Sequence, residues 1–400
     1  MPMFKNDSYL WLVLARTLTG IGFGNSALIR AYASQSSSSE DRSRALAWTT
    51  AGDTLGTTTG LLVQILFFPL GLEGFSFFGF PFTAYTTRAL LACLINVFGF
   101  IIVSKFFVED YTMLRIEKKE LDNQTVSPCW LALGICVLTR SSQALLLSTN
   151  DVVGSPYISM MFGYSEKETL QYNILMMLIQ SVIGLVIYFA YITLNLGKKL
   201  AIRTSIRLSL ASFLLYHVLT FSYPFYSDYV ELENPAANSA AMSREYGVCE
   251  VRRYSWCTTL TTFNPFLYYI SYLVLIGGFF PIINIALTTL LSKVIGPRAQ
   301  GTYQGLFQVA GCISKMSSPV MLGYAYDMAG PRLLWIIQES QTIFVFLLWI
   351  AFNGRMIGMS ERIEKMERRQ KVTRKEMSQK AVNVWTTNNH KTRNEFVNIK

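Results

Sequence analysis

Five ionisable side chains lie inside stretches of sequence that are otherwise apolar: Arg16, Asp53, Arg140, Asp151 and Lys315. A charged group in a hydrocarbon environment is costly unless it faces water or a partner, so each of the five is a candidate functional residue. A carboxylate in such a place can carry a proton, and a guanidinium or ammonium group can hold an anion. The alternative is that the five form internal ion pairs that only hold helices together.

The sign of these charges favours one kind of ligand. Three basic groups against two acidic groups leave the apolar interior weakly cationic, which favours a small anionic solute with Asp151 as proton carrier. Amide side chains that could hydrogen-bond such a solute are Asn150, Gln171, Asn173, Gln180, Asn284 and Gln308. The sequence shows no zinc ligand set, phosphate-binding glycine loop or nucleophile elbow, and it has two histidines. We therefore expect no metal, no cofactor and no enzymatic activity.

The composition is that of a polytopic membrane protein. Hydrophobic residues make up 51% of the chain and charged residues 15%, against about 25% charged residues in soluble domains. Apolar runs of about 20 residues, long enough to cross a bilayer as helices, recur along the chain. The expected spans are 9–32, 45–69, 84–107, 129–155, 168–195, 200–222, 262–292, 300–326 and 332–353. The predicted fold class is all-α.

Lysine and arginine are concentrated in alternate loops and in the tail 355–400. Because such loops face the cytosol, the C-terminus is expected to be cytosolic and the loop 223–261 luminal or external. That tail has twelve Lys/Arg and five Glu, a net charge of 12 − 5 = +7. It is interpreted as a solvated cytosolic tail, with attraction to anionic lipid as the alternative. The expected partners are a small solute and the bilayer, without nucleic acid, and the oligomeric state stays open.

Two of the six cysteines, Cys249 and Cys257, share the loop 223–261. An oxidising compartment permits a disulfide between them, and two free thiols are the alternative.

The first apolar run also carries a motif, an arginine followed by three glycines at alternate positions: Arg16, Gly20, Gly22 and Gly24. On a membrane helix this pattern resembles the fourth transmembrane helix of the major facilitator superfamily. In that twelve-helix fold three helices come before the motif, so the resemblance implies a chain that lacks them. Residues 1–107 would then be a partial first half with helices four to six. Residues 108–127 would be a cytosolic central linker, and residues 128–354 a complete six-helix second half.

A lysosomal branch of that superfamily is resembled more closely in the second half, notably at residues 292–307 and 329–335. Within the first of these, Gly296 and Pro297 should end one helix, and Gly301 and Gly305 have the spacing that allows two helices to approach closely. These glycines are candidates for a pivot between two helices. A simple tight cytosolic turn explains the same residues.

The resemblance also bears on the charged residues. Asp151 falls where the branch has Glu, and Lys315 where it has Arg, whereas Asp53 departs from the usual Gln. The partners of Arg16 would lie on the three helices that come first in the superfamily. The resemblance implies a secondary active transporter of a small anionic solute, proton-coupled, in an endolysosomal membrane. The alternatives are an anion-conducting channel and a non-transporting fragment of a longer transporter.

Overall fold

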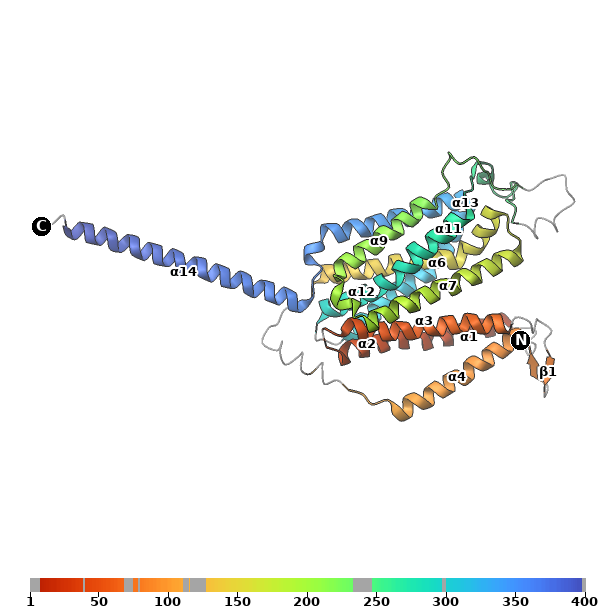
Figure 1. The fold of residues 1–400 in the computed structure, drawn as a ribbon, viewed down its shortest axis with the longest axis horizontal. Coiled ribbons are helices and arrows are strands. Elements are labelled where there is room, and N and C mark those ends of the chain that lie inside the picture. Colours follow the sequence, from red (N-terminus) through yellow and green to blue (C-terminus); the bar gives the residue numbers. More distant parts are fainter. Residues whose placement is uncertain are drawn as a thin grey trace.

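The structure is a computed structural model that describes residues 8–38, 40–67, 75–77, 80–110, 115, 127–232, 247–296 and 300–397. These residues form helices apart from loops and one small hairpin (Figure 1). The first part comprises α1 (Ser8–Phe23), α2 (Asn25–Ser36), α3 (Arg42–Leu66), the antiparallel strands β1 (Phe75–Phe77) and β2 (Phe80–Phe82), and α4 (Ala84–Phe106).

The second part is larger and more tightly packed. It comprises α6 (Trp130–Phe162), α7 (Glu166–Thr193), α8 (Leu196–Lys199), α9 (Ile202–Leu219), η2 (Ser255–Thr259), α11 (Pro265–Ser271), η3 (Tyr272–Gly277), α12 (Gly278–Ile295), α13 (Gln300–Ala351) and η4 (Asn353–Arg355). A final helix, α14 (Met359–Val397), extends away from the bundle (Figure 1).

Every predicted span falls on a helix of this structure. Span 9–32 covers α1 and α2, which are separated by a turn at Gly24. Spans 300–326 and 332–353 are the two arms of α13, which breaks at Gly330, where φ is 70°. By length and composition, 6 of the described helices can cross a membrane, the whole of α13 counted as one. The fold is thus the expected all-α, polytopic one.

Local sequence signals explain where helices begin, end and bend. Ser165 and Glu168 form a reciprocal capping box at the start of α7, which satisfies two otherwise free backbone donors. Pro281 lies just after the π-helical segment η3, where the regular hydrogen-bond pattern is interrupted. Ser212 of α9 donates to the carbonyl oxygen of Leu275 in η3 at 2.8 Å. The π-helical segment η3 is therefore stabilised by a hydrogen bond from the neighbouring helix α9.

The main core lies among α6, α9, α12 and α13. Polar contacts fix the pairing of α6 with α13: the indole of Trp349 donates to the hydroxyl oxygen of Thr139 at 2.9 Å, and the Ser318 hydroxyl donates to that of Ser148 at 2.6 Å. All four of these side chains are buried. Hydroxyl contacts of this kind satisfy polar groups that would be costly in lipid.

One end of the bundle, which we call the disulfide end, carries a structured loop between α9 and α11. Cys249 and Cys257 form a disulfide there, so the two free thiols are not found. Arg332 holds the same loop by donating to the carbonyl oxygens of Ser222 and Thr259, each at 2.9 Å. The predicted loop 223–261 is described except for residues 233–246.

Gly330 is required where this loop meets α13. Its φ of 70° is rare for residues with a side chain, and a Cβ there would lie 2.6 Å from the ring of Trp256. The boundary between the predicted spans 300–326 and 332–353 therefore lies at Gly330, where the loop contacts α13 through Trp256.

The opposite end, from which α14 begins, is called the α14 end. The tail 355–400 is predicted to be solvated, and the structure adds that Met359–Val397 is helical. Lys365 pairs with Glu361 at 2.9 Å one turn away, and Arg368 pairs with Glu364 in the same way. Such pairs support an exposed helix. The predicted linker 108–127 lies largely outside the described residues.

Candidate functional site: a polar crevice between α3 and the larger bundle

Two adjoining cavities lie between α3 and the helices α6, α7, α12 and α13. The outer cavity has a volume of about 380 Å³ and the inner cavity about 230 Å³. They share six lining residues, which makes them one continuous crevice: Thr54, Thr57, Leu147, Tyr188, Phe280 and Lys315.

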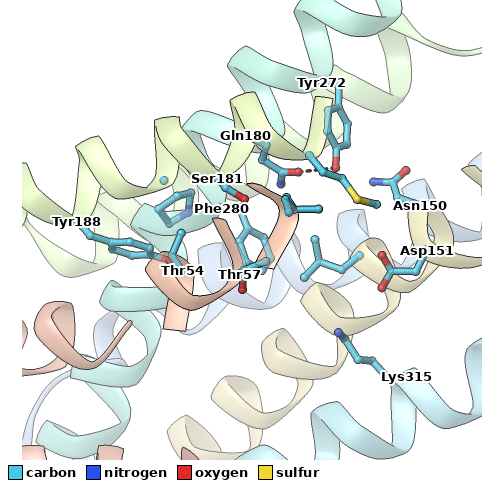
Figure 2. Close-up of a pocket in the computed structure, with 16 residues that line it drawn as sticks. Thr54, Thr57, Asn150, Asp151, Gln180, Ser181, Tyr188, Tyr272, Phe280 and Lys315 are labelled. Atoms are coloured by element: carbon cyan, nitrogen blue, oxygen red, sulfur yellow. Dashed lines mark hydrogen bonds between the residues drawn. The ribbon is translucent and has the colours of Figure 1, made fainter. Parts of the chain in front are cut away.

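Asp151 of α6 and Lys315 of α13 face each other in the outer cavity (Figure 2). Both side chains are solvent-accessible, and no ion pair within 4.0 Å joins them among the described residues. Nearby, the Tyr272 hydroxyl donates to the amide oxygen of Gln180 at 2.8 Å, and Asn150 completes this side of the wall. The outer cavity thus offers an acid, a base and several hydrogen-bonding groups to one small volume.

Arg30 and Asp53 form an ion pair at the wall of the inner cavity. The distance from Arg30 Nη2 to Asp53 Oδ2 is 3.2 Å. Arg30 is only 8% exposed, whereas the Asp53 side chain is 54% exposed. The pair joins α2 to α3 and places a guanidinium deep between the helices.

Arg140 of α6 enters the inner cavity from the other side. Its Nη1 lies 3.5 Å from the amide oxygen of Asn284, and its guanidinium lies 5.6 Å from the centre of the Phe307 ring. The Asn284 amide nitrogen lies 3.5 Å from the Tyr188 hydroxyl. In the described part of the chain, no carboxylate lies within 4.0 Å of this guanidinium. Arg140 is therefore held by weak neutral contacts.

The crevice is closed at the α14 end. Ala47 of α3 is fully buried and packs with Tyr188, Tyr191 and Ile192 of α7 and Ile285 of α12. From this contact α3 and α7 diverge toward the disulfide end (Figure 1).

Tighter and more polar contacts lie beyond this apolar layer. A Cβ at Gly197 would lie 2.6 Å from Ser43 Cβ, so the chain approaches α3 closely there. Lys198 Nζ lies 3.3 Å from Glu40 Oε2 and 3.3 Å from Asp41 Oδ1. Hydrogen bonds to Asp41 and Glu40 raise the pKa of Lys198, so it is charged at neutral pH.

The structure brings four of the five predicted ionisable residues to this crevice. Asp151 and Lys315 line the outer cavity, and Asp53, Arg140 and Lys315 line the inner one. Arg16 does not line either cavity. It is exposed on α1, where every side chain from Leu10 to Gly22 is exposed. Arg16 lies well inside an apolar helix, but no described helix packs on that face of α1. Its side chain therefore stays exposed.

Sequence reasoning missed Arg30, because an arginine near the end of a span can reach the membrane surface and needs no partner inside the bundle. A usable signal is the cluster of small residues beside it, Ala31, Ala33 and Ser34, because all three are buried and mark the packed face of α2. Of the amides, Asn150 and Gln180 line the outer cavity and Asn284 and Gln308 the inner one. Gln171 lines a separate apolar pocket near the disulfide end, and Asn173 lines neither cavity.

Of the glycines singled out in the sequence, Gly301 and Gly305 do not make, with the part of the chain that the structure describes, the close helix contacts that were predicted for them. Within the described residues, a Cβ at Gly20, Gly22, Gly301 or Gly305 would have no atom of another helix within 4 Å. The close helix approach expected at Gly301 and Gly305 is therefore absent from this arrangement, because that face of α13 is open. Gly296 ends α12 with φ of 71°, and a Cβ there would meet Met359. Pro297 lies outside the described residues.

The chain matches no protein-family profile. It is similar to "Major facilitator superfamily domain-containing protein 8" of Xenopus laevis, with 24% identity over 92% of this chain and 76% of that protein. This similarity and the helical bundle agree with each other. The chain is an all-α polytopic membrane protein that resembles the major facilitator superfamily.

Proposed function

We propose that this protein is a secondary active transporter that moves a small anionic solute with protons across an endolysosomal membrane. The similarity supports a membrane transporter in general and, with it, a non-enzymatic role. The observation that carries the finer proposal is that Asp151 of α6 and Lys315 of α13 face each other in one accessible cavity. In this scheme Asp151 takes up the proton and Lys315 balances the charge of the solute.

The closed α14 end supports alternation between two open states. Lysine and arginine are concentrated at that end, which by the positive-inside rule is the cytosolic one. The crevice then corresponds to a conformation closed toward the cytosol, and transport requires Ala47 to separate from α7 and α12. Rocking of two helical groups about a central site is the usual mechanism of such carriers.

Asp151→Asn tests the proton-carrying role directly. The variant keeps the size of the side chain but cannot ionise, so pH-gradient-driven uptake into proteoliposomes should fall by at least about tenfold, as for loss of a proton-transfer group. Uptake should also lose its dependence on pH. The matched control is Asp228→Asn, an exposed residue outside the crevice. Wild-type uptake by Asp151→Asn at every pH would refute coupling through this residue.

The anion-channel alternative requires an open path through the molecule. The buried layer around Ala47 interrupts such a path in this conformation. Electrical recording separates the two functions, since a pore gives currents far above carrier turnover and needs no proton gradient. Reconstitution of this 400-residue chain tests the non-transporting alternative, because a remnant would give neither current nor gradient-driven uptake.

A further inference from the structure

We propose that the inner cavity binds the oxoanion group of the solute, a carboxylate or a phosphate, between the guanidinium groups of Arg30 and Arg140. The proposal rests on the transporter function above and deepens it by naming the group that is recognised and the residues that hold it. These two arginines come from opposite walls of a cavity of about 230 Å³.

Arg30 is fixed in place but only partly used. Its Nη2 is taken by Asp53 at 3.2 Å, while its Nη1 is buried and has no hydrogen-bond partner. A guanidinium presents several N–H donors in a rigid plane, so a carboxylate on one edge leaves another edge for a ligand. Asp53 thus acts as a positioning residue that aims Arg30 into the crevice.

Arg140 has even fewer polar partners. Its Nε is buried without a partner, and the one hydrogen bond found for its Nη1, to Asn284, is long at 3.5 Å. An uncompensated buried cation is costly, and a bound anion would remove much of that cost. Gly311 makes this position possible, because a Cβ there would lie 3.2 Å from Arg140 Nε.

The balance of charge in the inner cavity favours an anion. Arg30, Arg140 and Lys315 contribute three positive charges and Asp53 one negative charge, which gives 3 − 1 = +2. Two buried amides add unsatisfied atoms to the same cavity: both polar atoms of Gln143 and the amide oxygen of Gln308. The ligand therefore meets an excess of positive charge at the inner end of the crevice.

The shape of the donors favours an oxoanion over a halide. Guanidinium edges match the paired oxygens of a carboxylate or phosphate, and these charge-assisted contacts are among the strongest hydrogen bonds in proteins. The inner cavity holds a group of that size, while the outer cavity of about 380 Å³ accepts the rest of the solute beside Asp151. Proton uptake and anion binding then occupy neighbouring parts of one crevice.

The test measures binding without any gradient. The full chain is placed in nanodiscs of zwitterionic lipid and its melting midpoint is followed with succinate, inorganic phosphate or chloride at equal ionic strength. We expect a saturable rise with succinate, with phosphate or with both, and none with chloride. The succinate and phosphate arms identify which oxoanion is preferred. Equal stabilisation by chloride would overturn the proposal.

Variants assign the binding to the two arginines. Arg140→Gln and Arg30→Gln should each weaken oxoanion binding by about tenfold or more, as expected for loss of a charged hydrogen bond. Arg140→Lys keeps the charge but not the planar fork, and it should bind detectably but less tightly, which provides a readout if Arg140→Gln does not fold. Arg207→Gln is the matched control, because Arg207 lines neither cavity and its hydrogen bonds within the described residues go to Arg203 and Thr204 of its own helix. Unchanged binding in both glutamine variants would refute the assignment.

Failure of this proposal can be told apart from failure of the transporter function. Asp151→Asn should retain oxoanion binding while it loses proton-coupled uptake. Coupled uptake in a protein whose arginine variants bind and transport normally would overturn the arginine site alone. Intact binding without any uptake would overturn the transporter function alone.

Discussion

At the scale of single residues, Arg140 can occupy its position because Gly311 has no side chain. A methyl group added there would lie 3.2 Å from Arg140 Nε and 3.4 Å from its Cγ, closer than these atoms can comfortably remain. We expect Gly311→Ala to displace the guanidinium and to cost roughly 1–3 kcal/mol of stability through overpacking. The control is Gly305→Ala on the same helix, where no atom lies within 4 Å of the new methyl.

Two measurements separate these glycine variants. The melting midpoint should fall in Gly311→Ala and stay level or rise in Gly305→Ala, because alanine is the better helix former. The KM for the solute should rise in Gly311→Ala alone. Equal behaviour of the two variants would show that the contact between Gly311 and Arg140 has no importance for the site.

The sequence identifies charged residues inside apolar helices, but it does not show which face of each helix points into the bundle. Asp151 and Lys315 could be found because they interrupt apolar runs in the packed part of the chain, and the cost of burying them points to a cavity. Arg16 satisfies the same rule, yet it faces outward on α1. Arg30 lies near the end of its span, where the rule does not select it, yet its side chain turns inward to Asp53. The direction of each side chain depends on which helix packs beside it, and a single sequence does not reveal that neighbour.

At the scale of helices, the contact between α3 and the chain around α8 controls the closed end. Gly197 approaches Ser43 so closely that a larger residue does not fit. We expect Gly197→Leu to force α3 away from α7 and to favour a state open at the α14 end. In a background whose free cysteines are replaced, Ala47→Cys should then react several-fold faster with a membrane-impermeant maleimide from that side.

Gly134→Leu is the comparison for this experiment, because Gly134 is an exposed helix residue with no described atom within 4 Å of a Cβ. It should leave the reactivity at position 47 unchanged. If Gly197→Leu also leaves that reactivity unchanged, the contact with Ser43 does not hold the end closed.

The positions of the helices along the chain could be predicted from the sequence, whereas their irregular segments and the contacts at their ends could not. Apolar runs of about 20 residues identify spans whatever their neighbours are. The division of α13 near Gly330 was anticipated by the separate spans 300–326 and 332–353, although the contact of Trp256 with that glycine was not. The π-helical segment η3 and the helical tail α14 were missed. The first depends on a contact from Ser212, and the second on charge pairs one turn apart in a segment of low hydrophobicity.

At the scale of the whole molecule, α14 extends a basic surface beyond the bundle. Residues 359–380 contain eight Lys/Arg and four Glu, a net charge of 8 − 4 = +4, beside the membrane-spanning part. Anionic lipid attracts such a segment, and salt screens the attraction. We expect a fluorophore at Met377→Cys, whose native side chain is 61% exposed, to be quenched by headgroup quenchers in anionic nanodiscs at low salt. Zwitterionic nanodiscs should give little quenching, and high salt should reverse it.

A charge-neutralised tail provides the decisive comparison. Replacing Arg368, Arg369, Lys371, Arg374 and Lys375 by glutamine removes five positive charges and makes the net charge of 359–380 4 − 5 = −1. Glutamine is a good helix former, so the helix should persist while attraction to the anionic surface is lost. Quenching should then match that in zwitterionic nanodiscs. Quenching that is the same in both lipids for the unaltered tail would instead identify α14 as a solvated helix that projects away from the membrane.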